Sequence, residues 1–71
     1  MKEWLEVSGR AQTRREIIER VSEATRKYFR LAEYAKVEVV IDGVTYEEEP
    51  MNYAGEMVFV GFYFNARGRA K

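Results

Sequence analysis

The sequence contains few of the side chains on which catalysis usually depends. It has no Cys and no His, which excludes thiolate nucleophiles, imidazole bases, and metal sites built from either group. Carboxylates, Tyr and Lys remain as groups that could transfer a proton, and no two of them stand at a spacing that would bring them together. The sequence therefore predicts a protein that is not an enzyme and binds no metal.

An acidic triplet is the most concentrated charge in the chain. Glu47, Glu48 and Glu49 directly precede Pro50, and carboxylate oxygens are ligands that hard cations prefer. The calcium-loop pattern is absent, however. The better interpretation is a solvated acidic loop that extends over Glu47–Gly55.

Arginines gather around the expected start of a helix. Arg14 and Arg15 would occupy the first turn, where the macrodipole disfavours cations, and Arg10 precedes them. With the free N–H groups of that turn they could bind an anion, or they could be ordinary solvated side chains. The chain carries 12 basic and 12 acidic residues, so no global field attracts nucleic acid.

A long amphipathic helix should position these groups. Thr13 and Glu16 fit a capping box at its start, and Glu16–Arg20 and Glu23–Lys27 are i,i+4 pairs in the favourable orientation. We expect the helix to run from about Thr13 to Ala35. Apolar residues recur along one face of it at spacings of three and four: Ile17, Val21, Ala24, Tyr28, Leu31 and Ala35.

Three segments alternate with the period of a strand. The first, Lys2–Val7, should end at Ser8-Gly9-Arg10, the second begins at Val37, and the third covers Met57–Phe64. Asp42-Gly43 predicts either a tight hairpin or a bulged bend within one long strand. Asn65–Lys71 should be a short basic tail without core residues.

The predicted fold is therefore a single α+β domain over residues 1–71. Its order is β-α-β-β, with one long helix packed on a mainly antiparallel sheet of three strands, or four if Asp42-Gly43 is a hairpin. A chain this short buries only about 60% of its unfolded surface, and it lacks the disulfides that often stabilise such domains. Packing and oligomerisation remain as sources of stability.

The last strand has more apolar surface than one helix can cover. One face of this strand would carry Val58, Val60, Phe62 and Phe64, and the other face would carry Met57, Phe59 and Tyr63. A second apolar face would then act in assembly or ligand binding, unless the tail or the acidic loop folds over it. Gly61 would form a bulge or leave room for an aromatic ring. The predicted face comprises Trp4, Val40, Phe59, Gly61 and Tyr63.

The compartment is predicted from what the sequence lacks. The segment Met1–Trp4 does not resemble a signal peptide, and no apolar run approaches the roughly 20 residues of a membrane span. We therefore expect a cytoplasmic protein without a membrane partner.

The order and spacing of these segments resemble the dodecins. The features that carry the resemblance are Val7-Ser8-Gly9 after the first strand, one long helix, Val37-Glu38-Val39-Val40, and a last strand with Val60-Gly61-Phe62. The resemblance implies a hollow homo-oligomer that stores or sequesters flavin without catalysis. The family's flavin-stacking Trp falls at Lys36, and its ring-contacting Gln falls near Gly55 or Glu56, so neither contact carries over.

Two other classes of function remain open. The chain is weakly similar to the N-terminal part of ribosome hibernation factors, which favours a nucleic-acid or ribosome-binding module using the arginines and the basic tail. A phage or accessory protein that inhibits a host protein by binding is the third class. We expect a homo-oligomer that binds a small aromatic ligand such as a flavin, or a purely structural assembly.

Overall fold

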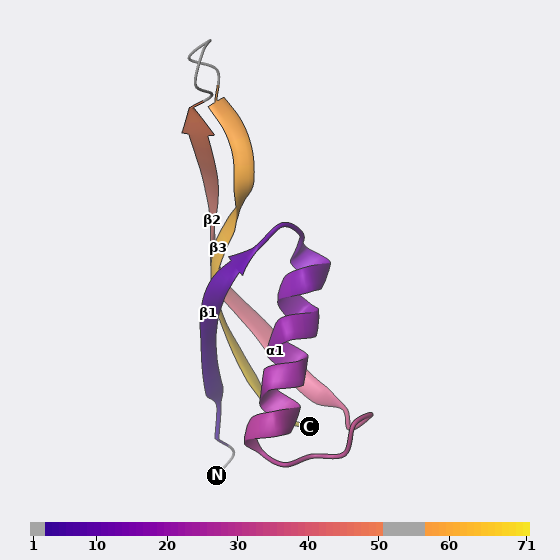
Figure 1. Cartoon of the computed structure of the whole chain (residues 1–71). Helices are drawn as coiled ribbons and strands as arrows, with labels where there is room; N and C mark the ends of the chain where they lie inside the picture. Colours follow the sequence, from indigo (N-terminus) through magenta and orange to yellow (C-terminus); the bar gives the residue numbers. More distant parts are fainter. Residues whose placement is uncertain (1–2, 51–56) are drawn as a thin grey trace.

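The chain folds as a helix packed on a three-stranded antiparallel sheet. The computed structural model describes residues 3–50 and 57–71. Within them the sheet order is β1-β3-β2, so the last strand is central (Figure 1). The predicted β-α-β-β order and the α+β class are confirmed. The elements are β1 (Leu5–Ala11), α1 (Arg14–Tyr28), β2 (Val37–Pro50) and β3 (Met57–Ala70).

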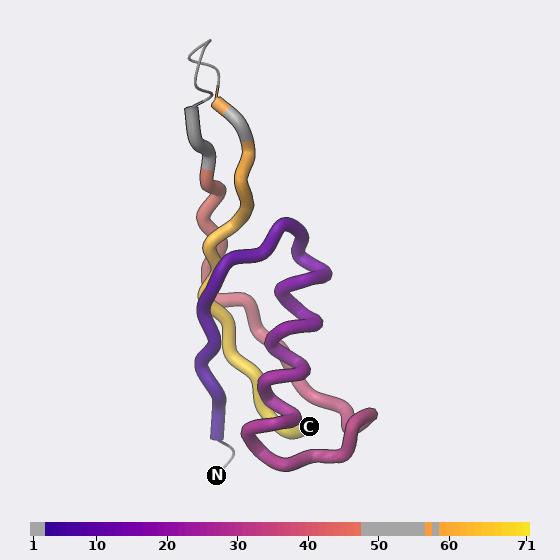
Figure 2. The backbone as a smooth tube through the Cα atoms, in the orientation of Figure 1, coloured from indigo at the N-terminus to yellow at the C-terminus, as the bar shows by residue number. Residues whose placement is uncertain are grey.

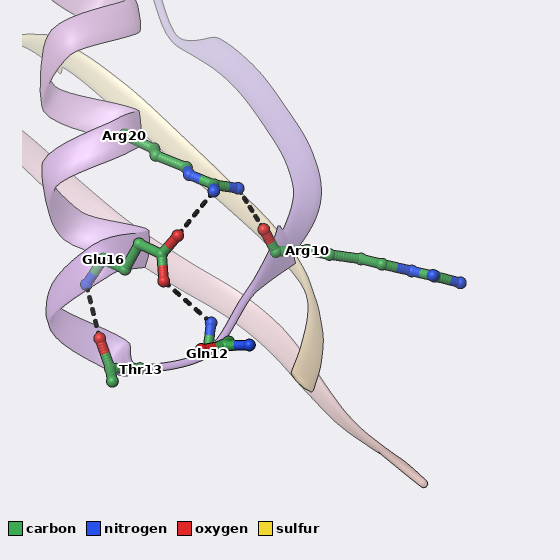
Figure 3. A network of polar contacts seen from close by, with 5 residues as sticks. All are labelled: Arg10, Gln12, Thr13, Glu16 and Arg20. Carbon is green, nitrogen blue, oxygen red and sulfur yellow. Dashed lines mark hydrogen bonds and ion pairs between the residues drawn. The ribbon is translucent and has the colours of Figure 1, made fainter. Parts of the chain in front are cut away.

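The capping box at the start of α1 is confirmed in one of its two hydrogen bonds. Thr13 is the N-cap, and its Oγ1 accepts a hydrogen bond from the backbone N–H of Glu16 at 3.1 Å. The Glu16 carboxylate reaches back one residue farther than expected and accepts the N–H of Gln12 at 3.0 Å (Figure 3). One N–H group that the helix leaves unpaired is thereby satisfied, and the residue before the cap is fixed to the first turn.

The end of α1 was predicted wrongly. The helix stops at Tyr28, well before Ala35. Arg30 adopts a left-handed φ of 54°, and its N–H donates to the carbonyl of Lys27 at 3.3 Å. The N–H of Leu31 donates to the carbonyl of Arg26 at 2.8 Å. This is a Schellman ending, which usually has Gly at the left-handed position. Because this position holds Arg30 instead of Gly, no residue type marked the end of the helix in the sequence.

The buried stripe of α1 differs from the prediction at its third turn. Ile17 and Val21 are fully buried as expected, but Tyr28 is 63% exposed and Thr25 is buried in its place. The Thr25 hydroxyl is satisfied because it donates to the Val21 carbonyl at 2.7 Å. A polar side chain therefore faces the sheet without an unpaired group.

Strands β1 and β3 are both longer than predicted. β1 continues through Ser8-Gly9-Arg10 to Ala11, and β3 continues to Ala70 instead of ending at Phe64. The predicted tail thus lies in the sheet, and its Ala66 is only 2% exposed. Gly68 lies directly beneath α1, where a Cβ would stand 1.9 Å from Thr25 Oγ1. The glycine permits this close helix–sheet contact.

Strand β2 is one bent strand and not a hairpin. Ile41 pairs with Ala66 and Gly43 pairs with Asn65, so Asp42 is an extra residue in the ladder. Of the two alternatives for Asp42-Gly43, the bulged bend is confirmed. β2 then runs on through Glu47–Pro50, which were expected to belong to a loop. The rest of that predicted loop lies outside the residues that the structure describes.

The core lies at one end of an elongated molecule. It comprises Ala11, Ile17, Val21, Phe64 and Ala66, with Val7, Val39 and Ile41 packed against them. The molecule measures 51 × 22 × 14 Å, and its radius of gyration is 15.1 Å. A compact chain of this length would have a radius of about 11 Å.

The elongation arises from a two-stranded projection. β1 stops pairing at Ala11, opposite Phe62, while β2 and β3 remain paired as far as Pro50 and Met57. This projection extends beyond both β1 and the start of α1 (Figures 1 and 2). We call it the arm and define it as residues 46–50 and 57–62.

Candidate functional site

Three aromatic rings contact one another on the arm. Tyr46 of β2 stacks on Phe59 of β3, with 4.8 Å between ring centroids and 26° between ring planes. Phe62 meets both rings edge-on, with its centroid 5.8 Å from that of Tyr46 and 5.1 Å from that of Phe59. These spacings lie in the range at which aromatic pairs attract one another.

A second bulge places these rings on the same face. Glu47 pairs with Gly61 and Glu48 with Phe59, which leaves Val60 as an extra residue in β3. Simple alternation would put Phe59 and Phe62 on opposite faces. The extra residue reverses the in-and-out alternation of β3, so both Phe59 and Phe62 lie on the same face as Tyr46. Farther along the sheet, this is the face that α1 covers.

Gly61 makes this bulge possible. Its φ of 143° is one that side chains rarely adopt, and a Cβ there would stand 3.2 Å from the carbonyl oxygen of Ala11. The bulge interpretation of Gly61 is therefore confirmed. The neighbour that approaches it is the backbone of β1, and not the ring of Trp4.

The arm exposes these apolar side chains to solvent. Tyr46 is 54% exposed and Met57 is 56% exposed. Met57 shares the face of Phe59 because it lies two residues before it in β3. Tyr46, Met57, Phe59 and Phe62 are together called the arm patch. Given about 150–250 Å² for a fully exposed aromatic side chain, the arm patch presents on the order of 400 Å².

The opposite face of the sheet is more polar than predicted. Trp4 lies under two guanidinium groups, those of Arg67 and Arg69, at 4.7 and 4.3 Å from its ring centroid. Arg67 also pairs with Asp42 at 3.0 Å, and Arg69 pairs with Glu38 at 2.7 Å. The expectation of an exposed apolar patch around Trp4 was therefore wrong at this end, and the alternative in which the tail covers this face is the one observed. The arginines of the predicted tail cover it from within β3.

The five residues predicted to form an assembly or ligand face are divided between two places. Trp4 precedes β1, and Val40 pairs with Arg67, so both lie near the arginines. Phe59, Gly61 and Tyr63 lie on or beside the arm. Because Gly68 pairs with Leu5, the Trp4 end and Gly61 are separated by about 23 Å along β3. Of the five residues, Phe59 and Tyr63 at the arm end are the exposed ones.

The three arginines of the predicted anion site do not converge. Arg10 extends away from α1 (Figure 3) and pairs with Glu47 at 3.3 Å. Arg15 pairs with Glu19 at 3.3 Å. The Glu16 carboxylate occupies the helix start and binds Arg20 at 2.6 Å. Arg20 in turn donates to the carbonyl of Arg10, so a carboxylate of the same chain lies at the helix start where an anion was expected.

A second surface was not predicted from the sequence. An open hollow of about 460 Å³ lies between α1 and β2, lined by Arg14, Ile18, Ser22, Val37, Val39 and Ile41. It adjoins a hollow of about 760 Å³ between α1 and residues 30–34, because Ile18 and Ser22 line both. We call the two together the helix groove. Ile18, 47% exposed, and Tyr34, 88% exposed, are its most accessible apolar side chains.

The described residues hold no group of three carboxylates that could bind a metal, and Glu47 of the acidic triplet is engaged by Arg10. No helix among them has both the length and the apolar character needed to cross a membrane.

The arm patch and the helix groove are two apolar surfaces that the described residues present. No protein-family model, curated protein or solved structure matches this chain.

Proposed function

We propose that this protein is a non-enzymatic homo-oligomer whose copies associate through the arm. The arm patch is the observation that carries the proposal. Its area, on the order of 400 Å², equals the largest apolar patch of a typical monomer, and such patches usually mark interaction sites. It projects from the core, so no other described element of the same chain covers it.

The physical state of the arm supports association. A two-stranded ribbon by itself is marginally stable in water, and beyond Ala11 no third strand or helix among the described residues lies against the arm. Packing against another copy would supply the missing contacts. The small size of the core, which contains only five buried apolar residues among those described, favours the same solution.

The alternative of a nucleic-acid-binding module has less support. The arm strand of β2 carries Glu47, Glu48 and Glu49, which would repel phosphates. Arg67 and Arg69, which belong to the basic segment expected to contact phosphate, are held by Asp42 and Glu38.

The resemblance to the dodecins extends the proposal to a hollow assembly that binds a flat aromatic ligand such as a flavin. The β-α-β-β order supports this extension. The Trp4 ring is already in contact with two guanidinium groups, so a ligand would stack on the arm aromatics instead. A yellow purified protein with flavin fluorescence after denaturation would support it, and a colourless protein that does not bind added flavin would contradict it.

The experiment that tests the proposal is the mass of the purified protein. Light scattering should give a multiple of the 8.4 kDa chain. Met57→Glu should reduce this to a single chain, because association would bury the new charge in the patch without a partner. Tyr28→Ser is the matched control, since Tyr28 is similarly exposed but lies on α1. A wild-type monomer at all concentrations would refute the proposal.

A further inference from the structure

We propose that the surface which receives the arm is the helix groove of a second copy. In this arrangement two copies exchange arms about a two-fold axis, so that each arm patch lies against the partner's α1. The inference rests on the proposed function, since it names the surface through which the copies would associate. It differs from the simpler arrangement in which two arm patches pack on each other.

The dimensions of the two surfaces match. The arm strand of β3, residues 57–62, is about 20 Å long at 3.3 Å per residue. Helix α1 has 15 residues and is therefore about 22 Å long. An arm laid along the helix would cover the groove from one end to the other.

The area required for a stable dimer favours exchange over arm-on-arm packing. Two arm patches packed on each other would bury about 800 Å² in total, which is the size of a typical crystal contact. The groove exposes apolar surface of its own, chiefly from Ile18 and Tyr34, on the order of 300 Å². Reciprocal exchange buries one arm patch and one groove on each copy, or about 1,400 Å² in total, which lies within the size range of specific interfaces.

The groove is lined by charges of both signs, with four basic side chains (Arg14, Arg26, Lys27 and Arg30) and three acidic ones (Glu19, Glu23 and Glu33). Arg14 lines the groove near one end and Arg30 lines it near the other. Neither forms an ion pair with the side chains that the structure describes, whereas Arg10, Arg15 and Arg20 do. The sequence of the arm includes the acidic triplet Glu47–Glu49, whose charge is opposite to that of these two guanidinium groups.

Disulfide trapping tests this inference directly, because the chain has no Cys of its own. Ile18→Cys would place a thiol in the groove, and Met57→Cys would place one in the arm patch. Both positions are exposed, so the substitutions should not disturb the fold. We would mix the two variants, oxidise them at low concentration, and measure the covalent dimer by mass.

The expected result is a mixed Ile18–Met57 dimer that forms at least ten-fold faster than the pairing of Met57→Cys with Tyr28→Cys. The Tyr28 pair measures random collision, because Tyr28 lies on the same helix outside the groove lining. Met57→Cys that links to itself instead would overturn the inference and leave association through the arm intact. If every pair formed a disulfide only at the rate of the Tyr28 control, and the wild-type protein had the mass of a monomer, both this inference and association through the arm would be rejected.

Discussion

At the scale of single residues, Gly68 and Thr25 determine how closely α1 approaches the sheet. A Cβ on Gly68 would stand 1.9 Å from Thr25 Oγ1 and 3.2 Å from Val21 Cγ1. Both neighbours are fully buried, so neither can turn away into solvent. The helix would have to move away from the strand.

Gly68→Ala should therefore lower the free energy of unfolding by about 2 kcal/mol, the usual cost of overpacking a core. Chemical denaturation measures it. Gly43→Ala is the matched control, because a Cβ at Gly43 would meet nothing within 4 Å. Adding Thr25→Ala to the Gly68→Ala variant should recover part of the loss. Equal effects at the two glycines would show that the close contact is not what constrains Gly68.

At the scale of elements, the length of α1 is set by a left-handed residue that is not Gly. Arg30 has φ 54°, and a side chain in that conformation costs about 1–2 kcal/mol. The backbone bonds that close the helix onto Lys27 and Arg26 hold it there. The chain can then turn back toward β2, whose Val39 and Ile41 pack against the core.

Replacing Arg30 by Gly should raise the free energy of unfolding by about 0.5–1 kcal/mol, since Gly adopts this φ without strain. Arg30→Ala is the control, because Ala removes the same charge but keeps the Cβ. Thermal and urea unfolding of both variants measure the difference. Stability of Arg30→Gly at or below that of Arg30→Ala would mean that the left-handed ending does not limit the helix.

The arm is also an element-scale feature, and it depends on two bulges. Asp42 is inserted in β2 and Val60 is inserted in β3, and bulges of this kind bend a strand and increase its twist. The second bulge also brings Phe59 to the face of Tyr46 and Phe62. Without it, Phe59 would lie on the opposite face of the sheet from Tyr46 and Phe62.

At the scale of the whole molecule, the structure has a small core at one end and an apolar arm at the other. If the arm is stabilised by a second copy, folding and association are linked, and stability depends on protein concentration. A monomeric domain of the same size would show no such dependence.

The Tm should therefore rise by several degrees over a 100-fold increase in concentration, which corresponds to about 2.7 kcal/mol of linkage. Calorimetry at matched scan rates measures it. Met57→Glu should have a lower Tm that does not change with concentration, and Tyr28→Ser should behave as the wild type does. A wild-type Tm independent of concentration would contradict linked association.

The sequence by itself determined the features that depend on neighbouring residues. The Thr13 cap of α1 and the strand that begins at Val37 follow from local hydrogen bonds and local periodicity. The β-α-β-β order follows from the succession of these local patterns. The absence of Cys and His likewise restricted the chemistry before any fold was known.

Only the tertiary structure decided the features that depend on strand pairing. The segment after Phe64 is basic, and it belongs to β3 because its two arginines have partners across the sheet. Arg67 and Arg69 both contact the Trp4 ring, and they form ion pairs with Asp42 and Glu38. Gly68 belongs there because it fits beneath Thr25. Register is a long-range property, and one inserted residue reverses every face that follows it. The same reason moved the exposed apolar surface from the predicted second face of the sheet to the arm.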